Sequence, residues 1–134
     1  MRCLIVDDDL TCRKVLRLSL APFYTIEEVA NGMVALERVG QSIHDGKPYD
    51  LIILDIMMPI MDGQSALVAI RSTECQQGIH PGQGAKIIMS SALGDTQNIR
   101  TAFREQGDGY ITKPVDIKKL YQLLRDFEQL PGSP

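Results

Sequence analysis

The run Leu51-Ile52-Ile53-Leu54-Asp55 is the most informative segment of the sequence. Its four apolar residues do not alternate with polar ones, a pattern typical of a strand that is buried on both faces of a parallel sheet. The aspartate that ends the run must open into a cleft, because an isolated buried carboxylate would be costly. We therefore expect a central strand whose carboxyl end carries a polar site.

On either side of this run, strand-like segments alternate with amphipathic helical patterns. The expected strands are Arg2–Val6, Thr25–Val29, Leu51–Leu54, Lys86–Ser90 and Gly109–Thr112, and the expected helices are Leu10–Leu20, Met33–Ile43, Gln64–Thr73, Asp95–Gln106 and Val115–Gln129. The Gly-rich stretch Glu74–Gly84 predicts a long flexible connection. Alternating strands and helices predict a parallel sheet covered on both faces, and right-handed crossovers then build a doubly wound α/β fold.

Length and composition limit the class of protein. The chain has 134 residues, of which 44% are hydrophobic and 23% are charged, so we expect one domain over residues 1–130 and a flexible tail over 131–134. A formal net charge of −3 argues against a nucleic-acid-binding surface. Asp55 and Pro59 interrupt the longest apolar stretch, so no transmembrane helix fits, and the N-terminus turns acidic too early for a signal peptide.

The cysteines and histidines indicate neither disulfide nor zinc chemistry. Cys3, Cys12 and Cys75 have unrelated spacings that match no disulfide framework and no zinc pattern. We expect reduced thiols in a cytoplasmic protein. His44 and His80 fall in polar loop segments, where solvated side chains are expected.

The acidic residues are unevenly distributed along the chain. Asp7, Asp8, Asp9 and Asp55 carry four of the negative charges, and without them the net charge would be +1. Much of the negative charge is therefore concentrated in one tripeptide and one isolated aspartate.

Polar side chains occur where four of the expected strands end. Asp7 and Asp8 follow the first strand, Asp55 the third, Ser91 the fourth and Lys113 the fifth. The carboxyl ends of parallel strands share one edge of the sheet, and ligands bind at that edge in doubly wound folds. We therefore expect these side chains to form one site.

The residue types at this edge predict phosphoryl transfer. Three clustered carboxylates repel one another, and their oxygen atoms favour Mg²⁺ or Mn²⁺, bound together with water and a phosphate group. Lys113 would add a point charge suited to a phosphoryl oxygen, and Ser91 would add a neutral hydroxyl donor. Asp55 would need no general base as a nucleophile, because a carboxylate is already ionised at neutral pH. Positioning and charge neutralisation are what this reaction requires.

Each of these signals also has an ordinary structural interpretation. Aspartates after an apolar run often cap a helix, Lys113-Pro114 would suit a surface turn, and Asp62-Gly63 is a common turn signal. The specificity lies in the combination, because the pieces occur at four strand ends in the correct order.

Five segments carry a family resemblance: Leu4–Asp9 (LIVDDD), Leu51–Pro59 (LIILDIMMP), Asp62-Gly63, Ile87–Ala92 (IIMSSA) and Gly109–Pro114 (GYITKP). Through them the chain resembles the response regulator receiver domain of two-component signalling, in its chemotaxis-regulator-like form. The resemblance extends from about Arg2 to Phe127. It implies a flavodoxin-like fold with a five-stranded sheet in the order 2-1-3-4-5.

The resemblance also implies roles for individual residues. Asp55 would be the phosphoacceptor, with Lys113 as the lysine of the site. Asp7, Asp8, Asp55 and the backbone carbonyl of Met57 would hold Mg²⁺. The resemblance thus implies that the side chains at these strand ends act together in one reaction.

A conformational switch is implied as well. Ser91 would be its hydroxyl residue and Tyr110 its aromatic partner, and the Lys113–Pro114 bond would be cis. Met57 and Leu93 stand where some family members carry polar side chains, and neither can orient an attacking water. We therefore expect slow loss of the phosphoryl group.

We expect a single-domain response regulator that takes a phosphoryl group from the phosphohistidine of a sensor histidine kinase or a phosphotransfer protein onto Asp55. It would be a signalling phosphoacceptor rather than an enzyme, although it would promote its own phosphorylation and dephosphorylation. Five residues follow Gln129, too few for an effector domain. Output is therefore expected through contact of the Asp95–Gln129 face with a separate protein, or by relay of the phosphoryl group.

Three alternatives stay open. A receiver domain excised from a larger hybrid kinase or effector protein would share all of these features. An Mg²⁺-dependent phosphatase with an aspartyl nucleophile would need a general acid and a substrate cap, and neither is visible in the sequence. A flavin-binding flavodoxin-like module would need a Ser-, Thr- or Gly-rich phosphate loop where Asp7-Asp8-Asp9 stands.

Overall fold

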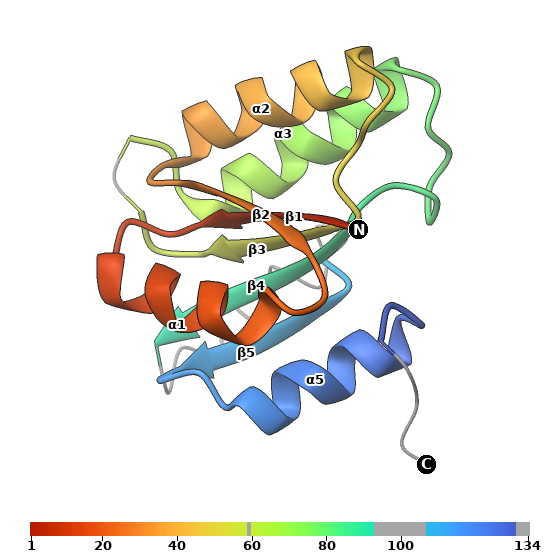
Figure 1. The fold of residues 1–134 in the computed structure, drawn as a ribbon. Helices are drawn as coiled ribbons and strands as arrows, with labels where there is room; N and C mark the ends of the chain where they lie inside the picture. Colours follow the sequence, from red (N-terminus) through yellow and green to blue (C-terminus); the bar gives the residue numbers. More distant parts are fainter. Residues whose placement is uncertain (59, 93–106, 131–134) are drawn as a thin grey trace.

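The fold is a five-stranded parallel sheet between two layers of helices. The computed structural model describes residues 1–58, 60–92 and 107–130. In that part of the chain the strands are β1 (Arg2–Val6), β2 (Thr25–Val29), β3 (Leu51–Asp55), β4 (Lys86–Ala92) and β5 (Gly109–Lys113). Each pairing is parallel and the order is β2-β1-β3-β4-β5 (Figure 1), which confirms the expected doubly wound α/β fold.

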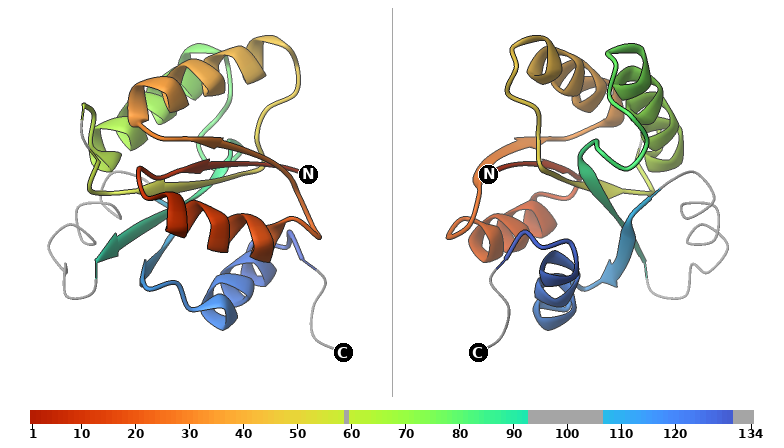
Figure 2. Two further views of the ribbon diagram at one scale, coloured as in Figure 1. Left: turned by 60° about the vertical axis from the view of Figure 1, so that its left-hand side comes forward. Right: turned by 90° about the vertical axis from the view of Figure 1, so that its right-hand side faces the viewer.

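Helices in the described ranges cover both faces of this sheet. They are α1 (Leu10–Leu20), α2 (Gly32–His44), α3 (Gly63–Gln76) and α5 (Ile117–Asp126). α1 and α5 lie on one face, and α2 and α3 lie on the other (Figure 2). The helix expected over Asp95–Gln106 and the expected tail lie outside the described residues. None of the described helices is long and apolar enough to cross a membrane.

β3 is the centre of the core because both of its faces are buried. Leu51 and Ile53 pack in the apolar cluster on the α1–α5 face, and Ile52 and Leu54 pack in the cluster on the α2–α3 face. All four side chains are fully buried, and burial of each contributes roughly 1.5–3 kcal/mol. The apolar run without alternation therefore forms the doubly buried strand that the sequence predicts.

Asparagine or aspartate caps the N-terminus of each of the four described helices. The side chains of Asp9, Asn31, Asp62 and Asp116 accept hydrogen bonds from backbone N–H groups in the first turn of their helices. Each of these helices follows a strand, so all four caps lie at the carboxyl edge of the sheet. The caps fix the loops that surround this edge.

Three strands extend further than the sequence predicts. β3 and β5 include Asp55 and Lys113, and β4 continues through Ser91 to Ala92. The parallel ladder explains the extension, because Asp55 pairs with Ser90 and Lys113 pairs with Ala92. These side chains therefore stand on the last rungs of the sheet rather than on loops.

The boundaries of α2, α3 and α5 also differ from expectation. α5 spans Ile117–Asp126 rather than Val115–Gln129, because Asp116 caps its start and Glu128, beyond its end, has a positive φ of 62°. α2 includes His44, which the sequence places in a loop. The His44 side chain is nevertheless exposed, as expected.

The connection that follows α3 is shorter and better anchored than the sequence predicts. α3 continues to Gln76, so Glu74 is helical and only 5% exposed. The Glu74 carboxylate accepts hydrogen bonds from Arg71 (2.7 Å) and from the backbone N–H of Ala85 (2.8 Å). Glu74 therefore ties the last turns of α3 to the residue that precedes β4.

Arg71 extends this network to β5. Its guanidinium donates to the carbonyl of Ala85 (2.9 Å) and to the carboxylate of Asp108 (2.7 Å). The Asp108 carboxylate also accepts from the backbone N–H of Ile87 (2.8 Å). We refer to Arg71, Glu74 and Asp108 as the amino-edge cluster, because they lie where β4 and β5 begin.

Candidate functional site

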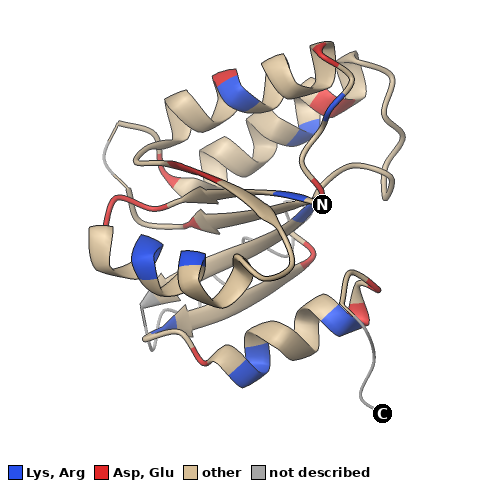
Figure 3. Cartoon of the chain, in the orientation of Figure 1, with Lys and Arg blue, Asp and Glu red and all other residues tan. Residues whose placement is uncertain are grey.

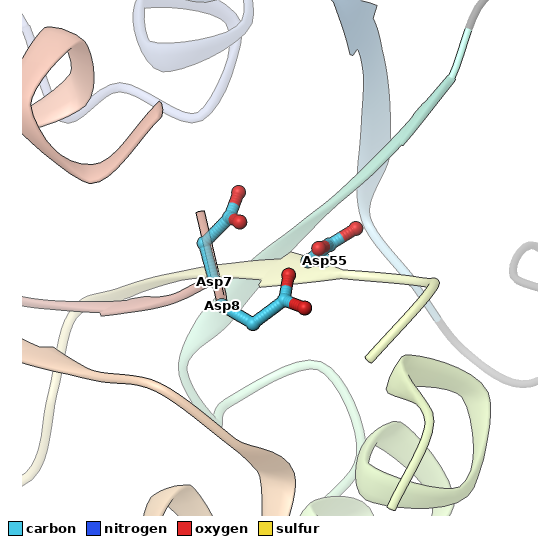
Figure 4. A group of neighbouring side chains, drawn as sticks. All are labelled: Asp7, Asp8 and Asp55. Atoms are coloured by element: carbon cyan, nitrogen blue, oxygen red, sulfur yellow. The ribbon is translucent and has the colours of Figure 1, made fainter. Parts of the chain in front are cut away.

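Three carboxylates meet where β1 and β3 end. Oxygen atoms of Asp7, Asp8 and Asp55 lie within 4.8 Å of one another (Figure 4). Asp7 is 2% exposed and Asp55 is 3% exposed, whereas Asp8 is exposed. The group, which we call the acidic cluster, is therefore reached from solvent at the carboxyl edge of the sheet.

The aspartate triplet after β1 divides into two roles. Asp9 caps α1, because its carboxylate accepts from the N–H of Thr11 (3.0 Å). The N–H of Asp9 in turn donates to Asp7 Oδ1 (2.9 Å), which orients the Asp7 carboxylate. Helix capping thus explains Asp9, and Asp7 and Asp8 are left to form the acidic cluster.

Lys113 brings a positive charge from β5 to the acidic cluster. Basic colouring at the end of β5 and acidic colouring after β1 and β3 lie on the same side of the sheet (Figure 3). Its Nζ lies 3.0 Å from Asp7 Oδ2 and 3.1 Å from Asp55 Oδ2, and it donates a hydrogen bond to Asp7 Oδ1 at 3.3 Å. Burial lowers the pKa of Lys113, but the hydrogen bond to Asp7 and the charges of Asp55 and Asp7 raise it by more. The net effect is a raised pKa. Lys113 is therefore an ammonium ion at neutral pH.

Asp55 has a strongly perturbed carboxylate. Burial and the charge of Asp7 raise the pKa of Asp55 to about 6, although Lys113 and the N–H of Met57 act in the opposite direction. One ammonium ion does not offset three carboxylates, so an additional cation would stabilise the site. At neutral pH Asp55 remains mostly ionised and can act as a nucleophile.

The loop after Asp55 is held by close backbone contacts. The N–H of Met57 donates to Asp55 Oδ1 (3.2 Å), and the N–H of Gly63 donates to the carbonyl of Ile56 (2.8 Å). A Cβ atom on Gly63 would lie 2.1 Å from the carbonyl oxygen of Asp55, so only glycine fits there. In the sequence, Asp62-Gly63 indicates a turn, but this contact with the site depends on tertiary structure.

Ser91 and Tyr110 lie on the strands beside the acidic cluster. Ser91 is 1% exposed, and in the described part of the chain its Oγ has no hydrogen-bond partner. Tyr110 packs against the apolar cluster on the α2–α3 face, and Ile111 packs in the apolar cluster on the opposite face. The two neighbouring side chains thus lie on opposite faces of the sheet, as alternation along a strand requires. The Lys113–Pro114 peptide bond is cis, as expected.

The ligand atoms of the acidic cluster fit a hard divalent cation. They are carboxylate oxygens, which suit Mg²⁺ or Mn²⁺ better than a soft metal. Asp7 Oδ2 accepts no well-aligned hydrogen bond from the described residues and is contacted by the Lys113 ammonium at 3.0 Å, so it keeps capacity for a further cation. The histidines and cysteines do not contribute: His80 is exposed, and the three cysteines are unpaired.

The family profile and the similar proteins indicate the same family. Residues 3–125 match the sequence profile of the family described as "Response regulator receiver domain". The chemotaxis protein CheY of Halobacterium salinarum is 33% identical over 92% of this chain and 92% of its own length. The osmosensing histidine protein kinase SLN1 of Saccharomyces cerevisiae is 26% identical over 95% of this chain, which spans only 10% of that kinase.

Solved structures agree in fold. The receiver domain of the histidine kinase CKI1 from Arabidopsis thaliana, described as complexed with Mg²⁺, has a TM-score of 0.77 and 28% identity. The alignment covers 94% of this chain and 90% of that domain. The fold similarity therefore extends over nearly the whole chain.

Proposed function

The chain belongs to the response regulator receiver domain family of two-component signalling, and from this premise we propose that Asp55 accepts a phosphoryl group. The observation that carries the proposal is the setting of Asp55. It is a buried but mostly ionised carboxylate, 3.1 Å from the Lys113 ammonium and next to the exposed Asp8. The donor would be the phosphohistidine of a sensor histidine kinase or a phosphotransfer protein.

In the proposed reaction, an Asp55 carboxylate oxygen attacks phosphorus in line with the bond to the donor. The new O–P bond forms as the P–N bond of the phosphohistidine breaks, and the electron pair of that bond returns to the imidazole nitrogen. Lys113 neutralises charge on the transferring group from its place beside Asp55. The backbone N–H of Met57 holds the carboxylate in orientation.

Mg²⁺ is the proposed cofactor of this site. The side chains of Asp7, Asp8 and Asp55 and the backbone carbonyl of Met57 would hold it, and the ion would supply positive charge to the phosphoryl oxygens. The carboxylate oxygens of the acidic cluster support this assignment. The CKI1 receiver domain described as complexed with Mg²⁺ gives it further support.

The acyl phosphate would act through a switch. Ser91 would donate a hydrogen bond to the new phosphoryl group, and the Tyr110 ring would fill the space that Ser91 leaves. The altered surface would be the Asp95–Gln129 face, of which residues 107–129 are described. A downstream protein would bind this face, or the phosphoryl group would be relayed in a cytoplasmic pathway.

Two architectures of the whole protein are compatible with the relatives. The chain spans 92% of the length of a CheY relative but 10% of the length of a sensor kinase relative. A free-standing regulator and a receiver domain of a larger protein are both compatible with the same site.

Intact mass after incubation with acetyl phosphate tests the proposal. We expect the wild-type protein to gain one phosphoryl mass with Mg²⁺ and none with a chelator. Asp55→Asn should gain none. Asp9→Asn is the matched control, because asparagine also caps helices and Asp9 lies next to the acidic cluster without belonging to it. Equal labelling of wild type and Asp55→Asn would refute the assignment.

A further inference from the structure

β4 carries two adjacent serines whose hydroxyl groups are buried. Ser90 and Ser91 are each 1% exposed, and neither Oγ has a hydrogen-bond partner among the described residues. A buried hydroxyl without a partner lowers stability relative to an apolar group of the same size. Each such hydroxyl therefore calls for a functional or structural explanation. The switch explains Ser91, but it leaves Ser90 without a role.

Ser90 lies on the same face of the sheet as the Asp55 side chain. The two residues are register partners on adjacent parallel strands. One repeat earlier, the partners Ile53 and Ile88 both pack in the apolar cluster on the α1–α5 face. Side chains alternate along a strand, so Asp55 and Ser90 face the same way and Ser91 faces the opposite way. A serine thus occupies a position where the pattern favours an apolar residue.

The Lys113 side chain crosses this same face. β4 lies between β5 and β3, so Lys113 must pass over β4 to bring its Nζ within 3.1 Å of Asp55. Lys113 is two residues after Ile111 in β5 and therefore points to the same face. Ile111 packs on the α1–α5 face and is the register partner of Ser90. Ser90 therefore lies beneath the ion pair between Lys113 and Asp55, where a small side chain leaves room for the lysine.

We propose that Ser90 is a positioning residue for phosphoryl transfer to Asp55, an inference that rests on the function proposed above. Before transfer, the N–H of Met57 contacts one carboxylate oxygen of Asp55 and Lys113 contacts the other. During transfer, Lys113 directs its charge to the phosphoryl oxygens, and the Asp55 carboxylate loses a partner. The Ser90 hydroxyl can rotate, and it then donates to the Asp55 oxygen that does not attack phosphorus.

The initial rate of labelling by acetyl phosphate, at saturating Mg²⁺, tests this role. We expect Ser90→Ala to lower the maximal rate about tenfold, the effect of one hydrogen bond made in the transition state. The acetyl phosphate concentration at half-maximal rate should stay within about twofold, because Ser90 acts on Asp55 rather than on the donor. Ser90→Thr, which keeps the hydroxyl, should label within about twofold of wild type.

Ser42→Ala is the matched control for loss of a buried hydroxyl. Ser42 is buried near the end of α2, and its Oγ donates to the carbonyl of Val39. Because α2 begins at the carboxyl edge of the sheet, its last turn lies away from the acidic cluster. We expect Ser42→Ala to label like wild type. The Mg²⁺ affinity of Ser90→Ala, measured by calorimetry, should also equal that of wild type, because Ser90 is outside the carboxylate set. Should Ser90→Ala not fold, Ser90→Cys gives the same comparison with a much weaker donor.

The outcomes separate this inference from the proposed function. If wild type is not labelled, the function of Asp55 fails and the role of Ser90 fails with it. If wild type is labelled and Ser90→Ala has the same rate, only the role of Ser90 is overturned. If Ser90→Ala and Ser90→Thr are slowed equally, the hydroxyl is not the cause, and the inference is likewise overturned.

Discussion

The two ends of the parallel sheet each carry a cluster of charged side chains, and the two clusters are arranged in opposite ways. At the amino edge, Arg71 lies between Glu74 and Asp108 and donates to both carboxylates at 2.7 Å. Each of these carboxylates also accepts a hydrogen bond from a backbone N–H. The amino-edge cluster therefore pairs its charges, of which Glu74 is buried and Arg71 and Asp108 are partly buried, within the protein.

The acidic cluster at the carboxyl edge leaves its charges partly unsatisfied. Lys113 is shared by Asp7 and Asp55, and Asp8 adds a third carboxylate close by. Burial and the Asp7 charge raise the pKa of Asp55, so holding it ionised costs folding free energy. The amino edge of the sheet is thus arranged for stability. At the carboxyl edge, repulsion among the carboxylates remains, and a bound cation would relieve it.

Arg71→Ala should have the largest effect on stability. The substitution leaves Glu74 and Asp108 without their common partner, and loss of one member of a buried ion pair costs about 3 kcal/mol. Urea unfolding would measure the loss. Arg38→Ala is the control, because its ion pair with Glu27 is half exposed and should contribute under about 1 kcal/mol. Equal effects of the two substitutions would contradict the contrast between the clusters.

Asp55→Asn should change stability in the opposite direction. The folded-state pKa of Asp55 is about 6 against an ordinary value of 3.8. The stability that protonated Asp55 contributes is therefore complete below pH 3.8 and lost as pH rises through 6. In the presence of a chelator, we expect Asp55→Asn to exceed wild type by about 2 kcal/mol at pH 7, with the difference disappearing near pH 4. A constant difference from pH 4 to pH 7 would show that Asp55 titration is not its source.

Asp8→Ala should have a smaller effect on stability and a clear one on metal binding. Asp8 is exposed, so removing its charge should stabilise the metal-free protein by under about 1 kcal/mol. Its loss should weaken Mg²⁺ binding, which isothermal titration calorimetry can measure, because one of three carboxylates is removed. Unchanged Mg²⁺ affinity would argue against a metal at this edge.

Ser91→Ala should act on the switch rather than on acceptance of the phosphoryl group. We expect the variant still to accept a phosphoryl group, since a hydroxyl is neither the nucleophile nor a carboxylate ligand. Amide chemical shifts with and without beryllofluoride would follow the response of β5 and α5. In Ser91→Ala most of that response should be lost. Shifts as large as in wild type would place the coupling elsewhere.

The sequence predicts the sheet and most of the acidic cluster for a clear physical reason. An apolar run that ends in aspartate is typical of a buried strand with a polar end, and parallel strands bring their carboxyl ends to one edge. This reasoning places Asp55 near Asp7 and Lys113, as the distances confirm. It depends on local pattern and on topology, which short segments of sequence encode well.

Other features depend on contacts that no short segment encodes. Glu74 belongs to a helix because Arg71 and Ala85 satisfy its carboxylate, although the nearby glycines favour a loop. Ser90 shares a face with Asp55 only because of the register between β3 and β4. In the sequence, Ser90 is merely the last residue of an expected strand. Register and side-chain pairing are tertiary properties, so the structure was needed to find them.

The close approach of Gly63 to the Asp55 carbonyl places a limit on how the chain can vary in length. Gly63 is the eighth residue after Asp55, and no side chain fits at that place. One inserted residue in the intervening segment would bring Asp62 to the contact, and one deletion would bring Gln64 there. Both changes also move the cap of α3 by one position. Insertions and deletions between Asp55 and Gly63 are therefore expected to disrupt this contact.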